Sequence, residues 1–410
     1  MPKSTFFTGQ PIFNQLLSYV SRSKVDQLVR KHGSDRYCKK FKAYDHLVTM
    51  LFCCFHRCTS LRELITGLQV NAHRLHHLGM VYTPRRSTLA DANERRGAIF
   101  FEDLYHELFR YHFGVLPDSL SKGKLSDKIF IVDSTTITLF SEIFKACGNA
   151  NANGKKKGGV KAHVLIRAKD NVPCFVHITA ASANDRGIMP QLHLPKGSIL
   201  VMDKGYNSYI PMADWTKKGI TWVTRLHKRA RWQCLEERPV SEKMLANGVR
   251  SDKNILLGTP EKANKTPLQN ARIITYYDEE TGREFEFLTN NLELNALTIA
   301  GIYKRRWQIE ILFRRIKQNF QLSNFLGDNQ NAIKIQLWCT LIADLLVKVV
   351  KDKADKLKKS KNWSFANVAG LIRQHLGTYI DLIKFLVNPE KAIIGYKSEI
   401  NSYQLSLFKT

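Results

Sequence analysis

Acidic residues are scarce in this sequence, and their scarcity limits what the protein is expected to bind. The chain of 410 residues has 36 Asp and Glu against 63 Lys and Arg, which gives a formal net charge of +27. A balance this basic predicts a polyanionic partner. Nucleic acid is the first candidate, and an anionic membrane surface is the second.

Long hydrophobic runs are missing as well. The longest apolar stretch near the C-terminal end, from Leu337 to Val350, is interrupted by Asp344 and Lys348 and is too short to span a membrane. Residues 1–20 lack the charged start, continuous apolar segment and small-residue cleavage site of a signal peptide. Both absences favour nucleic acid over lipid, and export is not expected.

Cysteines are few and irregularly spaced, with 8 in the whole chain. Without a regular framework they fit a reducing compartment such as the cytoplasm better than a disulfide scaffold. Cys53, Cys54 and Cys58 lie near His46 and His56, but no Cys-x2-Cys pair faces a second ligand pair at zinc-finger spacing. We expect these cysteines to be part of a hydrophobic core.

A helical N-terminal domain is predicted over residues 1–122. Apolar residues recur there at intervals of three and four, which predicts the helices Ile12–Val20, Ser23–Lys31, Ala43–Phe55, Leu61–Leu68 and Gly97–Phe113. Ser60 and Ser87 are expected N-caps, with Glu63 completing a capping box after Ser60. Basic residues between these helices suit recognition of DNA ends, although a plain solvated surface explains them nearly as well.

Strands are predicted from residue 123 onward. The apolar stretches that read as strands are Ile129–Ile137, Val160–Ala168, Val172–Ala180, Ser198–Asp203 and Gly219–Leu226. Helical stretches around Ile188 and from Tyr209 to Lys218 alternate with the last of them. This order predicts a mixed α/β sheet over residues 123–228.

The rest of the chain changes character twice. Residues 229–295 contain a hairpin formed by Ala271–Tyr277 and Arg283–Leu288, and they read as a β-rich insertion. A helix from Ala296 to Asn319 then resumes the α/β domain, whose second part is predicted over 296–345. The lysine-rich residues 346–410 are predicted to be a helical basic region, with a final helix from Phe365 to Leu386.

Three carboxylates are candidates for a metal site. Asp133 is embedded in an apolar strand, where an unpaired charge would be costly. Asp203 ends another strand just before a glycine turn, and strand ends face the crevice in which α/β sheets bind ligands. Asp185 is a rival for this second position, but it lies in a turn rather than at a strand end. Together with Glu310, two such acids suit a pair of Mg²⁺ ions acting on a phosphodiester.

Glu310 lies in a helix that is otherwise basic on one side. Tyr303, Arg306, Glu310 and Lys317 recur at helical spacings along one stripe, so a carboxylate and two cations share an edge. Alone, such a helix reads as an amphipathic surface segment with solvated charges. The two aspartates upstream favour the catalytic interpretation.

These residues resemble the signatures of DDE transposases of bacterial insertion sequences, specifically the insertion sequence 4 family. The most specific match is the motif Tyr-x2-Arg-x3-Glu-x6-Lys, met by Tyr303, Arg306, Glu310 and Lys317. The stretches around Asp133 and Asp203 resemble the other two signatures, although Arg is commoner than Lys at the residue after Asp203. The resemblance covers nearly the whole chain.

The resemblance implies a fold and a reaction. The fold would be an α/β, RNase H-like mixed-sheet catalytic domain, interrupted by the β-rich insertion and flanked by helical regions. Asp133, Asp203 and Glu310 would bind two Mg²⁺ ions, for which Mn²⁺ can substitute. Water would cut the strand at the element's end, and the freed 3′-hydroxyl would attack target DNA.

The resemblance also implies partners. Tyr303, Arg306 and Lys317 would hold the phosphates of the transposon end. The partner would be double-stranded DNA, both the terminal inverted repeats and the target DNA. A homodimer in a synaptic complex is expected, working in the bacterial cytoplasm in association with the nucleoid.

Three weaker signals remain open. Trp232, flanked by cations, is a candidate for stacking on a flipped base, and a core tryptophan explains it equally well. The glycine-lysine loop at residues 154–159 could touch phosphates, but it does not lead a strand into a helix as a nucleotide-binding loop would. His163 lies on a strand near Asp133 and could sit beside the metals, with ordinary strand packing as the alternative.

Two other functions compete with transposition. An RNase H-like nuclease would cut DNA without joining it. A DNA-binding regulator or transposase remnant would bind DNA without chemistry, although acids at all three positions argue against a remnant.

Overall fold

The computed structural model describes residues 7–80, 82–138, 159–262, 267–320, 322, 324–358 and 362–390. The chain forms two compact units. One, the helical unit, comprises Met1–Gly114 and Arg315–Thr410, and the other, the sheet unit, comprises Val115–Arg314. Among the described helices, none is both long and apolar enough to cross a membrane.

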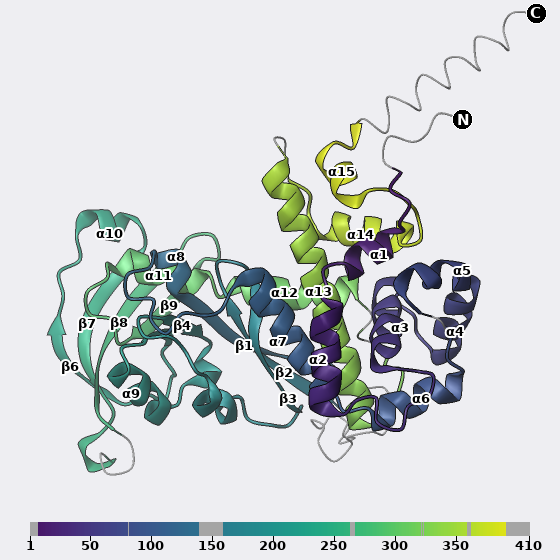
Figure 1. Ribbon diagram of the computed structural model, residues 1–410. Helices are drawn as coiled ribbons and strands as arrows, with labels where there is room; N and C mark the ends of the chain where they lie inside the picture. Colours follow the sequence, from purple (N-terminus) through teal and green to yellow (C-terminus); the bar gives the residue numbers. More distant parts are fainter. Residues whose placement is uncertain are drawn as a thin grey trace, which may run out of the picture. The chain divides into compact units, whose positions relative to one another are not determined.

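The described strands of the sheet unit form one nine-stranded sheet (Figure 1). They are β1 (Ile129–Thr138), β2 (Gly159–Arg167), β3 (Val172–Ala180), β4 (Ile199–Met202), β5 (Thr221–Arg225), β6 (Trp232–Glu237), β7 (Val249–Leu257), β8 (Gln269–Asp278) and β9 (Arg283–Thr289). Their order across the sheet is β3-β2-β1-β4-β5-β9-β8-β7-β6.

The first five strands confirm the predicted fold class. β1, β2 and β3 form an antiparallel meander, whereas β4 is parallel to β1 and β5 is parallel to β4. This mixed order is the RNase H-like arrangement. The sequence located each of these strands to within a few residues, because apolar runs bounded by turns mark buried strands clearly.

The strands of the predicted insertion continue the same sheet. β9 pairs with β5 in antiparallel fashion, and β8, β7 and β6 come next in turn. The predicted hairpin is confirmed as β8 and β9. The six residues of β6 are all exposed, as expected for an edge strand that has one neighbour.

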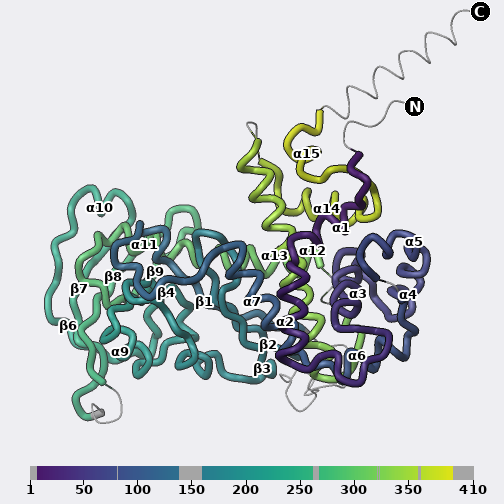
Figure 2. Tube along the Cα trace, in the orientation of Figure 1, coloured from purple at the N-terminus to yellow at the C-terminus, as the bar shows by residue number. Residues whose placement is uncertain are grey.

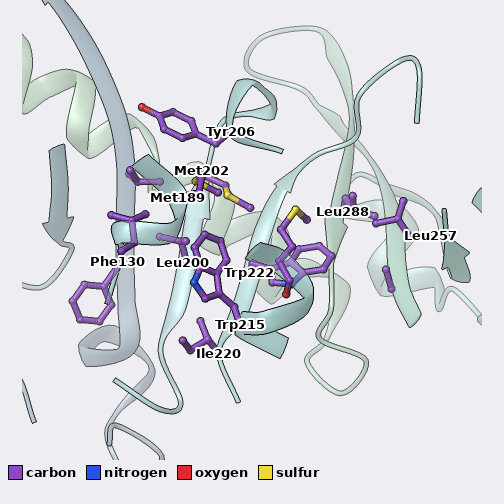
Figure 3. Close-up of a cluster of buried hydrophobic side chains, with 14 of the residues drawn as sticks. Phe130, Met189, Leu200, Met202, Tyr206, Trp215, Ile220, Trp222, Leu257 and Leu288 are labelled. Carbon is purple, nitrogen blue, oxygen red and sulfur yellow. The ribbon is translucent and has the colours of Figure 1, made fainter. Parts of the chain in front are cut away.

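One face of the sheet holds a hydrophobic core (Figure 3). Phe130 and Val132 on β1 alternate with residues that face the other side, and Leu200 and Met202 do the same on β4. Two further elements cover this face, the 3₁₀ helix η3 (Asp185–Gln191) and the helix α9 (Tyr209–Lys217). Close packing of these core residues gives the polar residues that follow them, Asp133 on β1 and Asp203 after β4, a fixed position.

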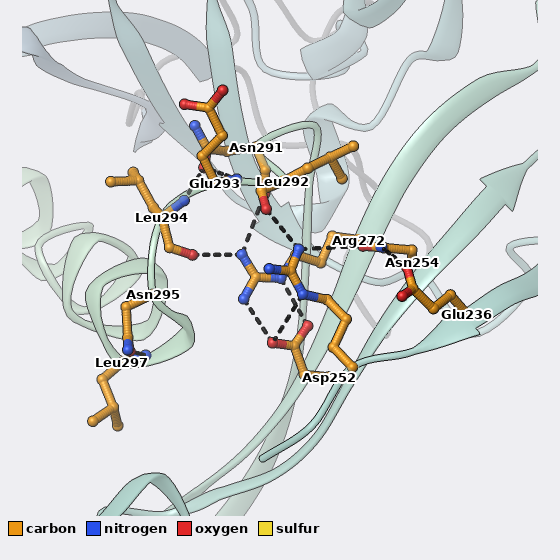
Figure 4. Close-up of polar contacts among 11 residues, drawn as sticks. Glu236, Asp252, Asn254, Arg272, Asn291, Leu292, Glu293, Leu294, Asn295 and Leu297 are labelled. Carbon is orange, nitrogen blue, oxygen red and sulfur yellow. Dashed lines mark hydrogen bonds and ion pairs between the residues drawn. The ribbon is translucent and has the colours of Figure 1, made fainter. Parts of the chain in front are cut away.

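A buried ion pair joins β7 and β8 to the segment that precedes the last helices of the unit (Figure 4). The Arg272 guanidinium donates to both carboxylate oxygens of Asp252, at 2.7 and 2.6 Å, and both side chains are almost fully buried. Its remaining nitrogen donates to the carbonyl of Leu294 at 2.5 Å. The pair therefore fixes the backbone just ahead of α11 (Ala296–Lys304).

The predicted single helix Ala296–Asn319 is wrong, because the chain forms two helices there, α11 and α12 (Trp307–Asn319). Between them, the N–H groups of Arg305 and Arg306 donate to carbonyls three residues back rather than four. The N–H groups of Gln308 and Ile309 do the same. Such 3₁₀ bonding tightens the helix to about three residues per turn and rotates the next residues about the axis. A pattern of apolar spacing does not reveal this change of pitch.

The sheet unit has four further short helical elements. They are α8 (Leu125–Lys128), η4 (Lys204–Tyr206), α10 (Glu242–Ala246) and η5 (Pro260–Lys262). Of these, η4 matters most for the candidate active site, because Asp203 is its N-cap.

The helical unit is built around the long helix α13 (Gln330–Leu357). Its other helices are α1 (Ile12–Leu17), α2 (Arg22–His32), α3 (Ala43–His56), α4 (Leu61–Val70), α5 (Ala72–Leu75), η1 (His76–Leu78), α6 (Arg86–Arg95), α7 (Ile99–Phe113), α14 (Phe365–His375) and α15 (Leu382–Val387). α13 packs against α3 and α7, which lie far from it in sequence (Figure 2). Asp344 on α13 is buried and accepts from Arg315, which burial of a charge requires.

Several helix boundaries differ from the prediction. Ser60 does cap α4, where its hydroxyl accepts from the N–H of Glu63, but the Glu63 carboxylate accepts from Thr59 rather than from Ser60. Ser87 is not a cap, because α6 begins one residue earlier. The predicted final helix Phe365–Leu386 is divided into α14 and α15.

Candidate active site

The register of the sheet brings the first two acids together. On the parallel strands β1 and β4, Ile131 pairs with Val201 and Val132 pairs with Met202. The next residues on the two strands are Asp133 and Asp203. Neighbouring strands lie about 4.8 Å apart, so the two aspartates stand side by side at the end of β4.

Arg306 links the first acid to the third. Its Nη1 donates to Oδ2 of Asp133 at 3.1 Å, and its Nη2 donates to Oε1 of Glu310. Arg306 lies in the 3₁₀ break between α11 and α12, and Glu310 lies in the first turn of α12. One guanidinium is thus shared by carboxylates from a strand and a helix.

Asp203 has a cation of its own. Nη2 of Arg225, at the end of β5, donates to Oδ1 of Asp203 at 2.5 Å, and the N–H of Gly205 donates to the other oxygen. Burial raises the pKa of Asp203, but the bond to Arg225 outweighs it, so that the pKa is lowered overall. We call Asp133, Asp203 and Glu310, with Arg225 and Arg306, the acid cluster.

Asp133 is the carboxyl group whose charge is most costly in this cluster. Burial raises its pKa to about 6, against the opposing effects of the Ser134 N–H and Arg306. The carboxylates of Asp203 and Glu310 raise it further. A buried acid surrounded by other acids is a site that favours additional positive charge.

A fourth acid, Asp185, lies next to the cluster. Its Oδ1 accepts from the Ser134 hydroxyl at 3.0 Å and from Nζ of Lys161 at 3.1 Å. A methyl group added at Gly205 would lie 3.8 Å from an oxygen of Asp203 and 3.9 Å from an oxygen of Asp185. From the sequence, Asp185 is rejected because it lies in a turn. That turn is folded back onto the middle of β1 at Ser134, and local spacing gives no sign of this.

His163 contacts this fourth acid rather than the other three. Its Nδ1 is 3.6 Å from Asp185 and its Nε2 is 3.0 Å from the Thr179 hydroxyl. Burial lowers the pKa of His163 to about 4, so the ring is neutral at pH 7. The histidine is packed in the sheet, beneath the acids.

The remaining predicted site residues occupy different surroundings. Tyr303 on α11 is buried, and its ring lies 4.8 Å from that of Phe287. Lys317 is exposed near the end of α12, in the part of that helix that belongs to the helical unit. Trp232 begins the edge strand β6 and is 38% exposed.

Two weaker predictions from the sequence concerned the cysteines and the glycine-lysine loop. Cys53, Cys54 and Cys58 are buried, which confirms the prediction that they belong to a core. The glycine-lysine loop lies outside the described residues, apart from Gly159, which starts β2.

The donor set of the acid cluster fits a divalent metal ion. Its three acids supply hard oxygen ligands, as Mg²⁺ and Mn²⁺ prefer, and burial raises the pKa of Asp133, so further positive charge beside this carboxylate would be favourable. As the described residues stand, no three acid, histidine or cysteine side chains converge on one point, since Arg306 lies between Asp133 and Glu310.

Comparison with known proteins agrees with this geometry. The family described as Transposase DDE domain matches residues 124–346, which include all three acids. The chain belongs to the DDE transposase family. Enzymes of this family act on DNA and depend in general on divalent metal ions. Residues 8–81 of the transposase also match a domain of unknown function, DUF4372.

Individual relatives carry transposase names. The transposase is 31% identical to the y4zB protein of Sinorhizobium fredii over 274 residues, which cover 65% of this chain and 72% of the relative. It is 26% identical over 232 residues to the Geobacillus stearothermophilus protein named as transposase for insertion sequence element IS5377, covering 55% and 57%. The piggyBac transposase in a synaptic complex with hairpin DNA aligns with a TM-score of 0.45 at 8% identity, over 91% of this chain and 79% of that one.

Proposed function

We propose that the transposase cuts DNA at the ends of an insertion sequence and joins the freed 3′-hydroxyl to target DNA. The observation that carries this proposal is the register of β1 and β4, which sets Asp133 in the middle of β1 beside Asp203 at the end of β4. Glu310 reaches the same place through Arg306. Three acids that meet at the carboxyl end of β4, two from neighbouring strands and one from a helix, are suited to phosphodiester chemistry.

Asp133, Asp203 and Glu310 would hold two Mg²⁺ ions, with Mn²⁺ as a substitute. When bound, such ions lower the pKa of an attacking water or hydroxyl and neutralise charge on the leaving oxygen. Arg225 keeps Asp203 ionised, and the packing of β1 holds Asp133 in place. The chain thus supplies ionised oxygen ligands at fixed positions before DNA arrives.

Arg306 is proposed to grip a phosphate of the transposon end. Its planar guanidinium suits bidentate contact, and Lys317 would act as a point charge further along α12. Tyr303 remains a candidate for the same strand, but its burial favours support of Arg306 over direct contact. Burial raises the pKa of Tyr303 to about 12, so its hydroxyl stays protonated.

The helical unit is proposed to bind the inverted repeats. A cavity of about 690 Å³ there is lined by the cations Arg36, Lys39, Lys40 and Arg95. Tyr37, at its rim, is 89% exposed and has a left-handed backbone with φ of 60°. Exposed aromatic and basic groups together suit the sugar-phosphate backbone and bases of DNA.

The division into five regions remains a prediction, as do three other features. Residues 1–122 would bind DNA, 123–228 and 296–345 would form the catalytic domain, 229–295 the insertion and 346–410 a basic tail. We also propose a homodimer that pairs two transposon ends, stacking of Trp232 on a DNA base, and a place in the cytoplasm beside the nucleoid.

The test uses purified protein, Mg²⁺ and a plasmid that carries the inverted repeats bordering the gene. Joined products support transposition. Cuts without joining would assign the chain to nucleases, and binding without cutting would make it a regulator or remnant.

Glu310→Gln is the matched variant, because it removes a charge with almost no change in shape. We expect it to bind the repeats with unchanged affinity and to make no cuts. Cleavage at the wild-type rate by this variant would contradict the assignment of the acid cluster as the active site.

A further inference from the structure

A small cavity lies beside the acid cluster in the sheet unit. Its volume is about 240 Å³, and its walls come from three short segments of chain. The polar and aromatic residues that line it are Arg186, Asn207, Ser208, Tyr209, His227 and Arg229. The sequence alone predicts no role for these residues, apart from the position of Arg229 near Trp232.

Two of the three walls of the cavity are attached to the acid cluster or to Asp185 beside it. Arg186 directly follows Asp185, which accepts from Ser134 beside Asp133. The Asn207 amide donates at 3.0 Å to the carbonyl of Arg225, whose side chain binds Asp203. A ligand in the cavity would therefore lie next to the acids.

The cavity has positive charge that is not compensated by acids. Among its lining residues there is no Asp or Glu, and within the described part of the chain neither Arg186 nor Arg229 is paired with a carboxylate. Arg225 and Arg306 differ in this respect, because each is bound to an acid. Both cavity arginines are exposed, so an anion can reach them.

Among the other lining residues, His227 adds a hydrogen-bond donor to those of the arginines. Nδ1 of His227 accepts from the N–H of Arg229 at 3.2 Å, which leaves Nε2 as the nitrogen that carries the ring proton. The Asn207 oxygen already accepts from the Thr224 hydroxyl at 2.8 Å. A phosphate requires donors, and two guanidinium groups beside a histidine N–H supply them.

We propose that this cavity holds a phosphate of the DNA strand being cut, next to the scissile phosphate, with Arg186 and Arg229 as its two contacts. The proposal rests on the proposed function, and it adds a second phosphate-binding site beside Arg306. Two guanidinium groups on either side of one phosphate would fix the strand along its axis, which positions the reacting phosphate at the acids.

The test measures DNA binding rather than cleavage. Full-length Glu310→Gln protein is the parent, and the probe is a labelled duplex copied from the inverted repeat. Fluorescence anisotropy is recorded from about 50 to 200 mM salt, a range in which phosphate contacts weaken strongly. The Arg186→Ala/Arg229→Ala variant is expected to bind at least tenfold more weakly, and its salt dependence should be reduced by about 1 in slope, because one phosphate contact is lost.

Two further variants make this result specific. Lys217→Ala/Arg283→Ala removes the same charge from exposed positions outside the cavity and is expected to keep the parent's slope. Arg186→Lys/Arg229→Lys is expected to recover most of the slope, because the charges return. Equal losses in the cavity variant and the outside variant would overturn the proposal.

Neutral methylphosphonate linkages, placed one at a time in the probe, locate the phosphate. One position near the cut is expected to weaken binding by the parent about tenfold and to have no further effect on the Arg186→Ala/Arg229→Ala variant. Position effects that are the same in both proteins would contradict the assignment. A parent that binds a scrambled duplex as tightly as the repeat would instead overturn the proposed function itself.

Discussion

Two arginine-carboxylate clusters in the sheet unit differ in how fully each guanidinium is satisfied. Arg272 is 1% exposed, binds both oxygens of Asp252 and also reaches a backbone carbonyl. Arg306 is 16% exposed and divides its nitrogens between Asp133 and Glu310, one to each. Arg272 binds both oxygens of a single carboxylate. Arg306 binds one oxygen of each of two carboxylates, so the other oxygen of each acid can bind another ligand. Carboxylate oxygens that the arginine leaves unbound therefore distinguish a binding site from a structural ion pair.

The largest effect is expected on breaking the complete pair. Arg272→Met leaves Asp252 buried without its cation, which typically costs about 3–5 kcal/mol of unfolding free energy. Urea denaturation followed by circular dichroism measures the loss. The double variant Arg272→Met/Asp252→Leu should recover most of it, since no charge is then left buried. A double variant as unstable as the single one would show that the pair is not the cause.

Arg306→Met is expected to reverse this pattern. Its contacts are buried less deeply than those of Arg272, so the loss of unfolding free energy should be smaller than for Arg272→Met. Cleavage of the end duplex should fall at least a hundredfold, as when a group that stabilises transition-state charge is removed. Gel assays of cleavage, beside the same denaturation curves, give both numbers. If Arg306→Met lost as much unfolding free energy as Arg272→Met, Arg306 would be part of a structural ion pair rather than of a binding site.

The pKa of Asp133 gives a pH test in metal-free protein. The folded pKa of about 6 lies above the value of 3.8 for an unperturbed Asp, so the folded state binds the proton more tightly than the unfolded state. Ionised Asp133 therefore lowers stability above pH 6, and this cost disappears as the pH falls from 6 towards 3.8. In EDTA, Asp133→Asn should be more stable than wild type at pH 7.5 by about 3 kcal/mol.

At pH 4 the difference between the two proteins should shrink to less than about 1 kcal/mol, because the carboxyl is then protonated in the folded wild type. A stability gain that persists unchanged at pH 4 would point to packing rather than charge.

The smallest effect is expected at Asp185, which acts through Ser134 on the neighbouring Asp133. Asp185→Asn should raise the Mg²⁺ concentration needed for half-maximal cleavage about tenfold, as loss of a group that supports a metal ligand commonly does. Unfolding free energy should change little. Asp170→Asn, in the turn after β2, is the control that should leave the metal dependence unchanged. Restoration by Asp185→Glu would mark a positioning role, and equal metal dependence in all variants would exclude it.

The sequence located what depends on local periodicity and missed what depends on long-range contacts. Strands β1 to β5 were placed to within a few residues, and the motif around Glu310 was placed on a helix, because burial patterns are local. Asp185 was set aside because nothing near it in sequence shows that its turn folds back onto Ser134. The 3₁₀ break at Arg306 was missed for a related reason, since a change of hydrogen-bond pitch leaves residue spacing unaltered.

The pairing of β5 with β9 means that the insertion cannot be deleted without affecting the catalytic domain. Phe287 on β9 is the register partner of Arg225, and Arg225 holds Asp203. Excising residues 229–295 as if they were a removable module would strip β5 of that neighbour and free the arginine that keeps the second aspartate ionised. The innermost strand of the insertion, β9, therefore also supports the catalytic centre.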